Sequence, residues 1–348
     1  MTPPIEWNLG MTVTEAAAPP EAVGRSRAQV RLLVVDRRRG VVRCEEFTGF
    51  PSWLGPGDVL VYNDSRTIPA ALPALWDGVP ARVHLAVRLS SRRAIVEKRR
   101  ADGGPDPALS DRNASVAILS RLGDLMALGR VVRRFHPESR LWVIDTDRDL
   151  YELAPLVGDP IRYGYVDRPY PLYYYQTIFG RVPGSAEMPS AGRPFTYEIV
   201  ARMVERGVIL CPITLHTSVS SHEVTQGLAR YPVLPEYYHI PRRTVRHITE
   251  ARQDGRRIIA LGTTVVRGLE TWAASGFGRR RGWTRYLITP NNPPLVVTNL
   301  VTGLHDNFSS HLALLYAFVD PPFLREAYRQ AGLAGFRWHE FGDLSFIV

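Results

Sequence analysis

Apolar and polar positions follow different periods in different parts of the 348-residue chain. Before residue 69 and after residue 146, short apolar runs rich in β-branched residues alternate with segments whose apolar positions recur every three to four residues. The first pattern is typical of buried strands and the second of amphipathic helices. Between residues 69 and 146, short segments alternate apolar and polar positions and are separated by Gly, Pro, Asp and Asn, which is typical of antiparallel strands.

The pattern predicts an alternation of strands and helices outside residues 69–146. Strands are expected at residues 31–36, 41–47, 59–62, 208–215, 257–261, 295–298 and 344–348. Helices are expected at residues 147–157, 196–206, 245–254, 265–274, 309–319 and 321–333. Because strands and helices alternate over residues 196–320, we expect a largely parallel α/β sheet, either open or barrel-like.

Residues 69–146 are predicted to form a second domain. Their period-two runs lie at residues 81–89, 94–98, 115–119, 127–135 and 141–145. Short antiparallel strands of this kind often close into a small barrel. We therefore predict an α/β domain made of residues 1–68 plus 147–348, interrupted by an all-β barrel domain at residues 69–146.

Polar or small residues follow three of the predicted strands, at the edge where parallel α/β sheets bind ligands. They are His216, Gly262 and Asn299. The run Gly262-Thr263-Thr264 also precedes a predicted helix. Glycine lets a ligand approach the backbone, and the threonines can cap a helix whose free N–H groups face that ligand. A capped turn without a ligand is the alternative.

Two of the loops at this edge have similar sequences. Residues 215–222 and 304–311 are identical at five of eight positions, and each loop carries two histidines. The residues are His216, His222 and the following Glu223 in the first loop, and His305 and His311 in the second. Acid–base work by the first histidine of each loop is favoured, because imidazole titrates near neutral pH. Convergence of four histidines on a metal is the alternative, and we expect no metal.

Residues 175–196 combine two clusters of Pro and Gly with large apolar side chains. Such a loop is typical of binding loops, but an ordered connection has the same composition. The tyrosines at residues 163–175 leave a similar choice. They either stack on an aromatic ligand or pack against one another with their hydroxyl groups exposed to water.

Amino-acid composition limits the classes of protein to which this chain can belong. Net charge is +9, but Lys98 is the only lysine among 43 basic residues and the arginines are scattered. A functional basic surface and solvated faces therefore both stay open. Cys44 and Cys211 imply neither a disulfide framework nor a thiolate metal site. No apolar run approaches a membrane span of about 20 residues, and no secretion signal is visible, so we expect a cytoplasmic protein.

Motifs along nearly the whole chain resemble those of one family. They are residues 31–36 and 57–70, Tyr175-Gln176-Thr177, Pro183-Gly184-Ser185, Pro189-Ser190-Ala191-Gly192 with Phe195, Thr214-Leu215-His216, Glu236-Tyr237, Gly262-Thr263-Thr264 with Arg267 and Leu269-Glu270, and Phe341-Gly342-Asp343. In this order and rough spacing they resemble the S-adenosylmethionine:tRNA ribosyltransferase-isomerases of queuosine biosynthesis.

The resemblance implies a fold and a reaction. Members have an α/β domain interrupted by a β-barrel domain and use S-adenosylmethionine as a substrate, not as a methyl donor. They transfer and isomerise its ribosyl part onto a 7-aminomethyl-7-deazaguanine base in tRNA, and adenine and methionine leave. The implied partners of this chain are thus S-adenosylmethionine and tRNA.

On this basis we expect three groups of site residues. The expected catalytic residues are His216, His305 and Glu236. The expected substrate-binding residues are Asn63, Arg66, Arg168, Tyr175, Gln176, Ser190, Gly192, Phe195, Gly262, Thr263, Thr264, Arg267 and Asn299. A further polar pocket is expected at His222, Glu223 and His311.

The chain departs from the family pattern in its chemistry-bearing loops. Arg193-Pro194 stands where the family has Leu-His, and Val233-Leu234 stands where it has Met-His. The loops at residues 218–222 and 303–307 are also rewritten. These changes leave the acceptor open between tRNA and a small molecule. A divergent paralogue that uses S-adenosylmethionine in another reaction, or one that binds RNA without catalysis, is the alternative.

Overall fold

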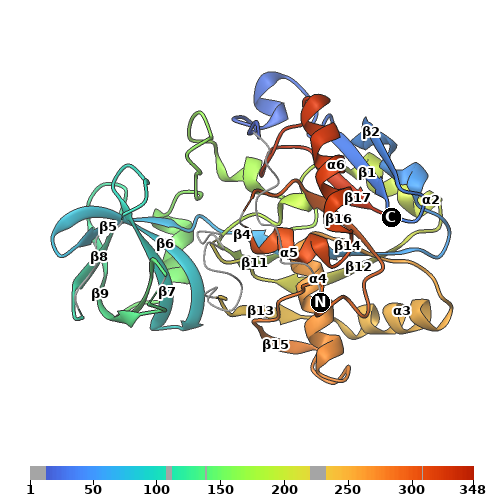
Figure 1. Ribbon diagram of the computed structural model, residues 1–348. Coiled ribbons are helices and arrows are strands. Elements are labelled where there is room, and N and C mark those ends of the chain that lie inside the picture. The colour runs from blue at the N-terminus through green and yellow to red at the C-terminus, as the bar shows by residue number, and fades with distance from the viewer. Residues whose placement is uncertain (1–12, 107–111, 138, 220–232, 308) are drawn as a thin grey trace.

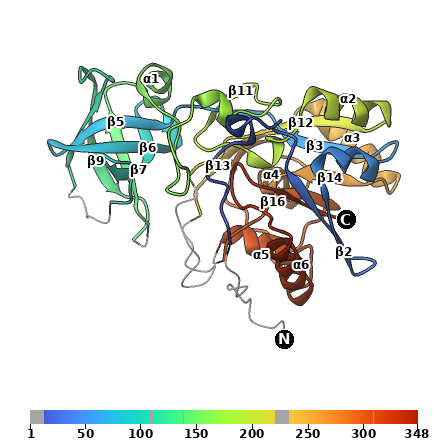
Figure 2. The same ribbon diagram turned by 90° about the horizontal axis from the view of Figure 1, so that it is seen from above.

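The computed structural model describes residues 13–106, 112–137, 139–219, 233–307 and 309–348. A large α/β part and a smaller barrel lie side by side, as both views show (Figures 1 and 2). The prediction of an α/β domain interrupted by a β-barrel is therefore confirmed. No helix in the described part is long and apolar enough to cross a membrane.

The α/β part is built on a nine-stranded sheet. Its strands, in spatial order, are β15 (Arg281–Thr284), β13 (Glu236–His239), β12 (Ile209–Leu215), β3 (Val59–Asn63), β14 (Ile258–Leu261), β16 (Asn299–Gly303), β17 (Leu344–Ile347), β1 (Arg31–Asp36) and β2 (Val41–Glu46). The four central strands, β12, β3, β14 and β16, are parallel, whereas antiparallel pairs flank them on both sides. The sheet is thus mixed, with a parallel centre.

Helices cover both faces of this sheet. They are α2 (Tyr197–Glu205), α3 (Arg242–Gln253), α4 (Thr263–Ala274), α5 (Ser310–Tyr316) and α6 (Pro321–Leu333). Apolar side chains of α3, α4, α5 and α6 form one core with the sheet, and those of α2 form another. Neighbouring residues of β1 illustrate the two faces, because Leu32 and Leu33 belong to different cores. Continuous burial on both faces explains the uninterrupted apolar run of this strand.

Helix starts follow the local sequence. Thr196 caps α2 by accepting from the Ile199 N–H at 3.4 Å, and Ser309 caps α5 by accepting from the Leu312 N–H at 3.2 Å. Pro321 begins α6, where a missing N–H costs nothing. These signals explain why the predicted helices at 196–206, 309–319 and 321–333 are found within a few residues of their expected ends.

The second part is a closed six-stranded antiparallel barrel. Its strands, in order around the barrel, are β10 (Leu141–Thr146), β7 (Arg93–Arg100), β6 (Val79–Ser90), β5 (Ala71–Trp76), β8 (Ser115–Leu119) and β9 (Leu125–Arg134). The apolar side chains of α1 (Leu150–Val157) belong to the barrel core. A short parallel pair, β4 (Ser65–Thr67) with β11 (Val182–Ser185), lies where the chain leaves the main sheet.

One predicted strand is wrong. Residues 295–298 are not a strand, because the N–H groups of Leu295, Val296 and Val297 donate to the buried carboxylate of Glu270 on α4. The strand β16 begins only at Asn299, which pairs with Ile259 near the start of β14. Asn299 therefore lies at the amino end of its strand, opposite to the edge where we expected it.

Candidate active site

A cavity of about 450 Å³ lies at the carboxyl ends of β14 and β16. Its walls come from segments far apart in the sequence, among them residues 163 and 165, 187–191, 217–219, 261–264 and 267, 302–306 and 309–311, and 339–340. Its volume is within the range of small-molecule sites. The location agrees with the general rule that ligands of parallel sheets bind at this edge.

The start of α4 forms one side of the cavity. Gly262 precedes the helix with a φ of 97°, a conformation that glycine adopts without strain. The N–H groups of the first helical turn have no intrahelical acceptor and carry a partial positive charge. Arg267, one turn further on, pairs with Glu236 and donates from Nε to the Tyr286 carbonyl at 3.3 Å. Its buried Nη2 has no hydrogen-bond partner, so this side offers donors to an anion.

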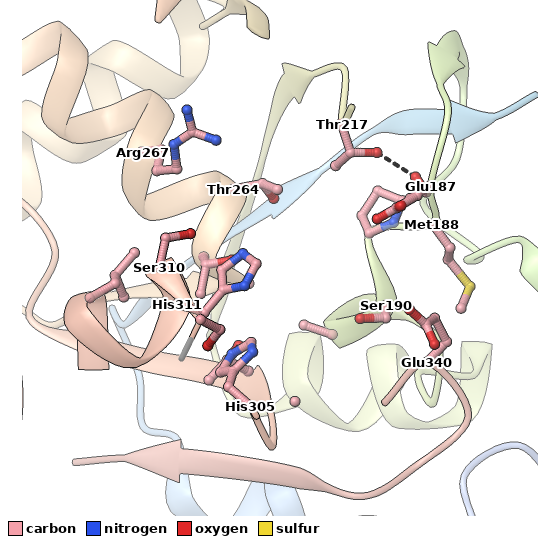
Figure 3. Close-up of a pocket in the computed structure, with 18 of the residues that line it drawn as sticks. Glu187, Met188, Ser190, Thr217, Thr264, Arg267, His305, Ser310, His311 and Glu340 are labelled. Carbon is pink, nitrogen blue, oxygen red and sulfur yellow. Dashed lines mark hydrogen bonds between the residues drawn. The ribbon is translucent and has the colours of Figure 1, made fainter. Parts of the chain in front are cut away.

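Two histidines lie on the same side, after β16 (Figure 3). The rings of His305 and His311 stack with centroids 4.7 Å apart, and His305 Nε2 lies 2.8 Å from the Thr302 hydroxyl. Burial lowers the pKa of His305 well below its ordinary value and that of His311 to about 4. Both imidazoles are therefore neutral at neutral pH. The expectation that His305 titrates near neutral pH is wrong, because burial disfavours its charged form.

The opposite side of the cavity is acidic (Figure 3). Glu187 and Glu340 line it together with Tyr163. Oε2 of Glu340 is buried without a hydrogen-bond partner, and burial raises the pKa of this carboxyl to about 7. Burial and then the negative charges of the two glutamates raise the pKa of Tyr163. Sequence reasoning missed both glutamates, although Glu340 directly precedes the Phe341-Gly342-Asp343 motif and Glu187 lies between two motifs of the loop at residues 175–196.

His216 lies elsewhere. It lines a second cavity, of about 340 Å³, between the barrel and the main sheet, with side chains such as Val87, Tyr151 and Trp283. Its Nδ1 is 2.8 Å from the Ser65 hydroxyl, and burial lowers its pKa from the ordinary value. Glu236 lines both cavities, so they are neighbours. The first histidines of the two loops, His216 and His305, therefore lie in different cavities, although residues 217–219 of the first loop line the cavity of His305.

The expected site residues divide into three groups. Those that line the first cavity are Ser190, Glu236, Gly262, Thr263, Thr264, Arg267, His305 and His311. Those that do not line it are Asn63, Arg66, Arg168, Tyr175, Gln176, Gly192, Phe195, His216 and Asn299. His222 and Glu223 are outside the described residues.

Several of the residues in the second group make structural contacts. The amide of Asn63 donates to the Leu215 carbonyl at 2.8 Å and accepts from its N–H at 3.0 Å. Gln176 makes the same kind of double contact with the backbone of Thr67. Tyr175 and Phe195 are buried in apolar clusters. Their polar and apolar groups are thus used to hold the loops around the cavity.

Arg193, which replaces a family histidine, is buried. Its guanidinium lies 2.6 Å from the Glu21 carboxylate, donates to the Tyr174 carbonyl at 3.0 Å and stacks 4.9 Å from the centre of the Phe341 ring. These contacts tie the amino-terminal segment to the loop before α2. Arg193 does not line the cavity.

A metal site would need several His, Cys, Asp or Glu side chains close together. Over the described ranges, no group of three or more of them is placed to hold a metal ion. The pair of His305 and His311 is instead stacked ring on ring.

Comparisons with known proteins agree with this architecture. The model of the family described as queuosine biosynthesis protein matches residues 10–347. An S-adenosylmethionine:tRNA ribosyltransferase-isomerase of Thermotoga maritima is 30% identical over 340 residues, which are 95% of this chain and 97% of the relative. One of Thermosynechococcus vestitus is 32% identical over 344 residues, covering 95% and 93%.

A solved structure is also similar. The crystal structure of an S-adenosylmethionine tRNA ribosyltransferase from Thermotoga maritima covers 96% of both chains, with 26% identity and a TM-score of 0.52. The described fold and the match over residues 10–347 therefore lead to one conclusion: the chain belongs to the queuosine biosynthesis family of S-adenosylmethionine:tRNA ribosyltransferase-isomerases.

Proposed function

We propose that this protein consumes S-adenosylmethionine and moves its ribosyl part, with isomerisation, onto the amine of a 7-aminomethyl-7-deazaguanine base in tRNA. Adenine and methionine leave. The family of the chain supports this reaction, because its relatives carry the same activity in their names. The observation that carries the proposal is the cavity at the carboxyl ends of β14 and β16, with the start of α4 and Arg267 in its wall.

This wall suits the methionine carboxylate of the substrate. The first N–H groups of α4 carry partial positive charge, and Arg267 Nη2 has a donor without a partner. Arg267 keeps its position because Glu236 accepts from its Nη1 and itself accepts from the Ser218 N–H at 3.0 Å. Glu236 is therefore assigned a positioning role, through Arg267.

The chemistry needs a base near the ribose. A sulfonium makes the hydrogens of the adjacent 5′ carbon acidic, and a positioned neutral group must accept the proton. His305 is neutral at neutral pH and lines the cavity. We assign it this role, with Thr302 holding its ring through Nε2. The resulting carbanion attacks within the ribosyl group. The acceptor amine forms a C–N bond to that group as the glycosidic C–N bond breaks, and the amine proton goes to the departing adenine. Methionine departs with the electron pair of the broken C–S bond.

Product release tests the function. The protein is incubated with S-adenosylmethionine alone, with tRNA carrying the deazaguanine base, and with the free base, and adenine is measured by chromatography. Adenine that depends on the tRNA is the expected result. Adenine that depends only on the free base assigns a small-molecule acceptor instead. RNA binding without adenine release in any mixture overturns the enzymatic function and favours a non-catalytic paralogue.

A further inference from the structure

We propose that Glu340 and Glu187 form a cation subsite in the first cavity, which binds the sulfonium or ammonium group of a substrate. The identity of these cations rests on the proposed function, whereas the subsite itself rests on the geometry. Two groups share this chemistry, the charged centres of S-adenosylmethionine and the primary amine of the acceptor. The experiment below separates them.

The first argument is the unsatisfied carboxylate of Glu340. Its Oε2 is buried and has no hydrogen-bond partner, in a residue that lines the cavity. Burial of an ionised carboxylate oxygen without a partner costs free energy, and the pKa of the carboxyl group rises as a result. A cation in the cavity supplies the missing partner and favours the ionised form. A substrate with a positive charge therefore complements Glu340 when it binds in this cavity.

The second argument is that Glu340 does not act alone. The negative charges of Glu187 and Glu340 both act on the Tyr163 hydroxyl and raise its pKa. All three residues line the first cavity. Figure 3 shows Glu340 beside Ser190, and Glu187 above Met188, both on the side away from Arg267. Two carboxylates at one place suit a cation better than a neutral group.

The third argument is the aromatic surface beside the glutamates. The rings of Tyr163 and Tyr165 stack 5.6 Å apart, and Tyr165 stacks 4.5 Å from His339. His339 Nε2 in turn lies 3.3 Å from an Asp306 carboxylate oxygen. The faces of aromatic rings attract sulfonium and ammonium groups, as they attract other cations. The rings also hold the acidic side in a fixed position.

Together the two sides divide the cavity by charge. The N–H donors at the start of α4 and Arg267 line one side of the cavity, which has a volume of about 450 Å³, and carboxylates line the other side. A zwitterion with a carboxylate at one end and a cationic centre nearby satisfies both sides at once. A substrate amine next to the ribose satisfies the acidic side alone.

Binding of charged and neutral ligands tests the subsite. Calorimetry compares S-adenosylmethionine, S-adenosylhomocysteine (which lacks the sulfonium charge), neutral 5′-methylthioadenosine, and 7-aminomethyl-7-deazaguanine. The proteins are the wild type, Glu340→Gln, Glu187→Gln, and Glu205→Gln as matched control. Glu205 is exposed on α2 and does not line the cavity. Thermal unfolding of each variant confirms that it is folded.

We expect Glu340→Gln to weaken a cationic ligand at least about tenfold and to leave 5′-methylthioadenosine unchanged. A loss confined to S-adenosylmethionine assigns the subsite to the sulfonium, and a loss shared with S-adenosylhomocysteine assigns it to the α-ammonium. A loss confined to the deazaguanine amine assigns it to the acceptor. Equal affinities of variant and wild type for every cation overturn the subsite. No binding of any adenosine ligand to the wild type overturns the proposed function instead.

Discussion

The loops after β12 and β16 have similar sequences but different surroundings. The first histidine of one loop, His216, lines the cavity beside the barrel, whereas His305 lines the cavity at the sheet edge. The reason is the strand order, because β3 and β14 lie between β12 and β16. Equivalent positions in two loops at the same edge of a sheet can thus lie in different cavities, even though residues 217–219 of the first loop line the cavity of His305.

The two histidines also differ in what holds them. His216 bonds through Nδ1 to Ser65, whose hydroxyl lies 2.6 Å from that of Ser185. His305 bonds to Thr302 and stacks on His311. The first set belongs to the β4–β11 connection and the second to the cavity wall. The comparison therefore suggests a positioning role for His216 and a chemical role for His305.

The largest expected effect separates these roles. His305→Ala should lower the rate of adenine release at least about 100-fold, because it removes the group that accepts the proton. His136→Ala, on the barrel and outside the cavity, is the matched control and should keep the wild-type rate. A near-normal rate of His305→Ala would contradict its role as base.

A backbone change tests how His216 is held. Gly184 has a φ of 152°, and a Cβ there would lie 2.6 Å from the His216 ring. Gly184→Ala should lower the free energy of unfolding by about 2 kcal/mol, because the ring must move. Denaturant unfolding measures this loss. Gly49→Ala, where an added Cβ meets nothing within 4 Å, should lose much less. Equal losses at both positions would show that His216 has room to shift.

His216→Ala should have a smaller effect on turnover than His305→Ala. We expect adenine release to fall about tenfold, because the loss acts through Ser65, Ser185 and the neighbouring Glu236, not on the reacting atoms. Steady-state kinetics of both variants give the ratio. A loss of turnover equal to that of His305→Ala would contradict the positioning role and would indicate that both histidines take part in the chemical step.

The smallest expected effect is on pH dependence. The cationic ligand that depends on Glu340 should bind several-fold more weakly at pH 6 than at pH 8. The pKa of this carboxyl is about 7, so the ionised form that attracts a cation is lost as pH falls through 7. The other titratable groups that line this cavity are Glu15, Tyr163, Tyr165, Glu187, Glu236, Arg267, Tyr286, His305, Asp306, His311 and His339.

Titration calorimetry at several pH values measures this change, and the slope should vanish in Glu340→Gln. Burial lowers the pKa of His305 well below its ordinary value and that of His311 to about 4, so these two cavity histidines contribute little slope between pH 6 and 8. A slope that persists in Glu340→Gln would assign the titration to another group.

Local patterns predicted much of the fold. The apolar runs at β1 and β3 and the strand–Gly-Thr-Thr–helix order are local signals, and each is found as expected. The threonines do not cap α4 as expected, because Gly262 is the cap residue and the helix already begins at Thr263. Residues 295–298 failed for a nonlocal reason, since their N–H groups bind Glu270. The short strands β13 and β15 were not anticipated, because each has only four residues and, unlike β14, no continuous apolar run.

The candidate site was predicted only in part. Gly262, Thr263, Thr264 and Arg267 were found because a strand, a turn and a helix are consecutive in the sequence. Glu187 and Glu340 are 153 residues apart in the sequence, and no local pattern indicates that they meet.

The sequence by itself determined the family, the parallel centre of the sheet, the inserted barrel and the helix start that faces the cavity, because these depend on periodicity and on adjacent residues. Only the tertiary structure decided which side chains share a cavity. Strand order separated His216 from His305, and the packing of the loops placed Glu187 and Glu340 in the wall of one cavity. Burial then lowered the pKa of the histidines and raised that of Glu340, because removal from water disfavours every charged form.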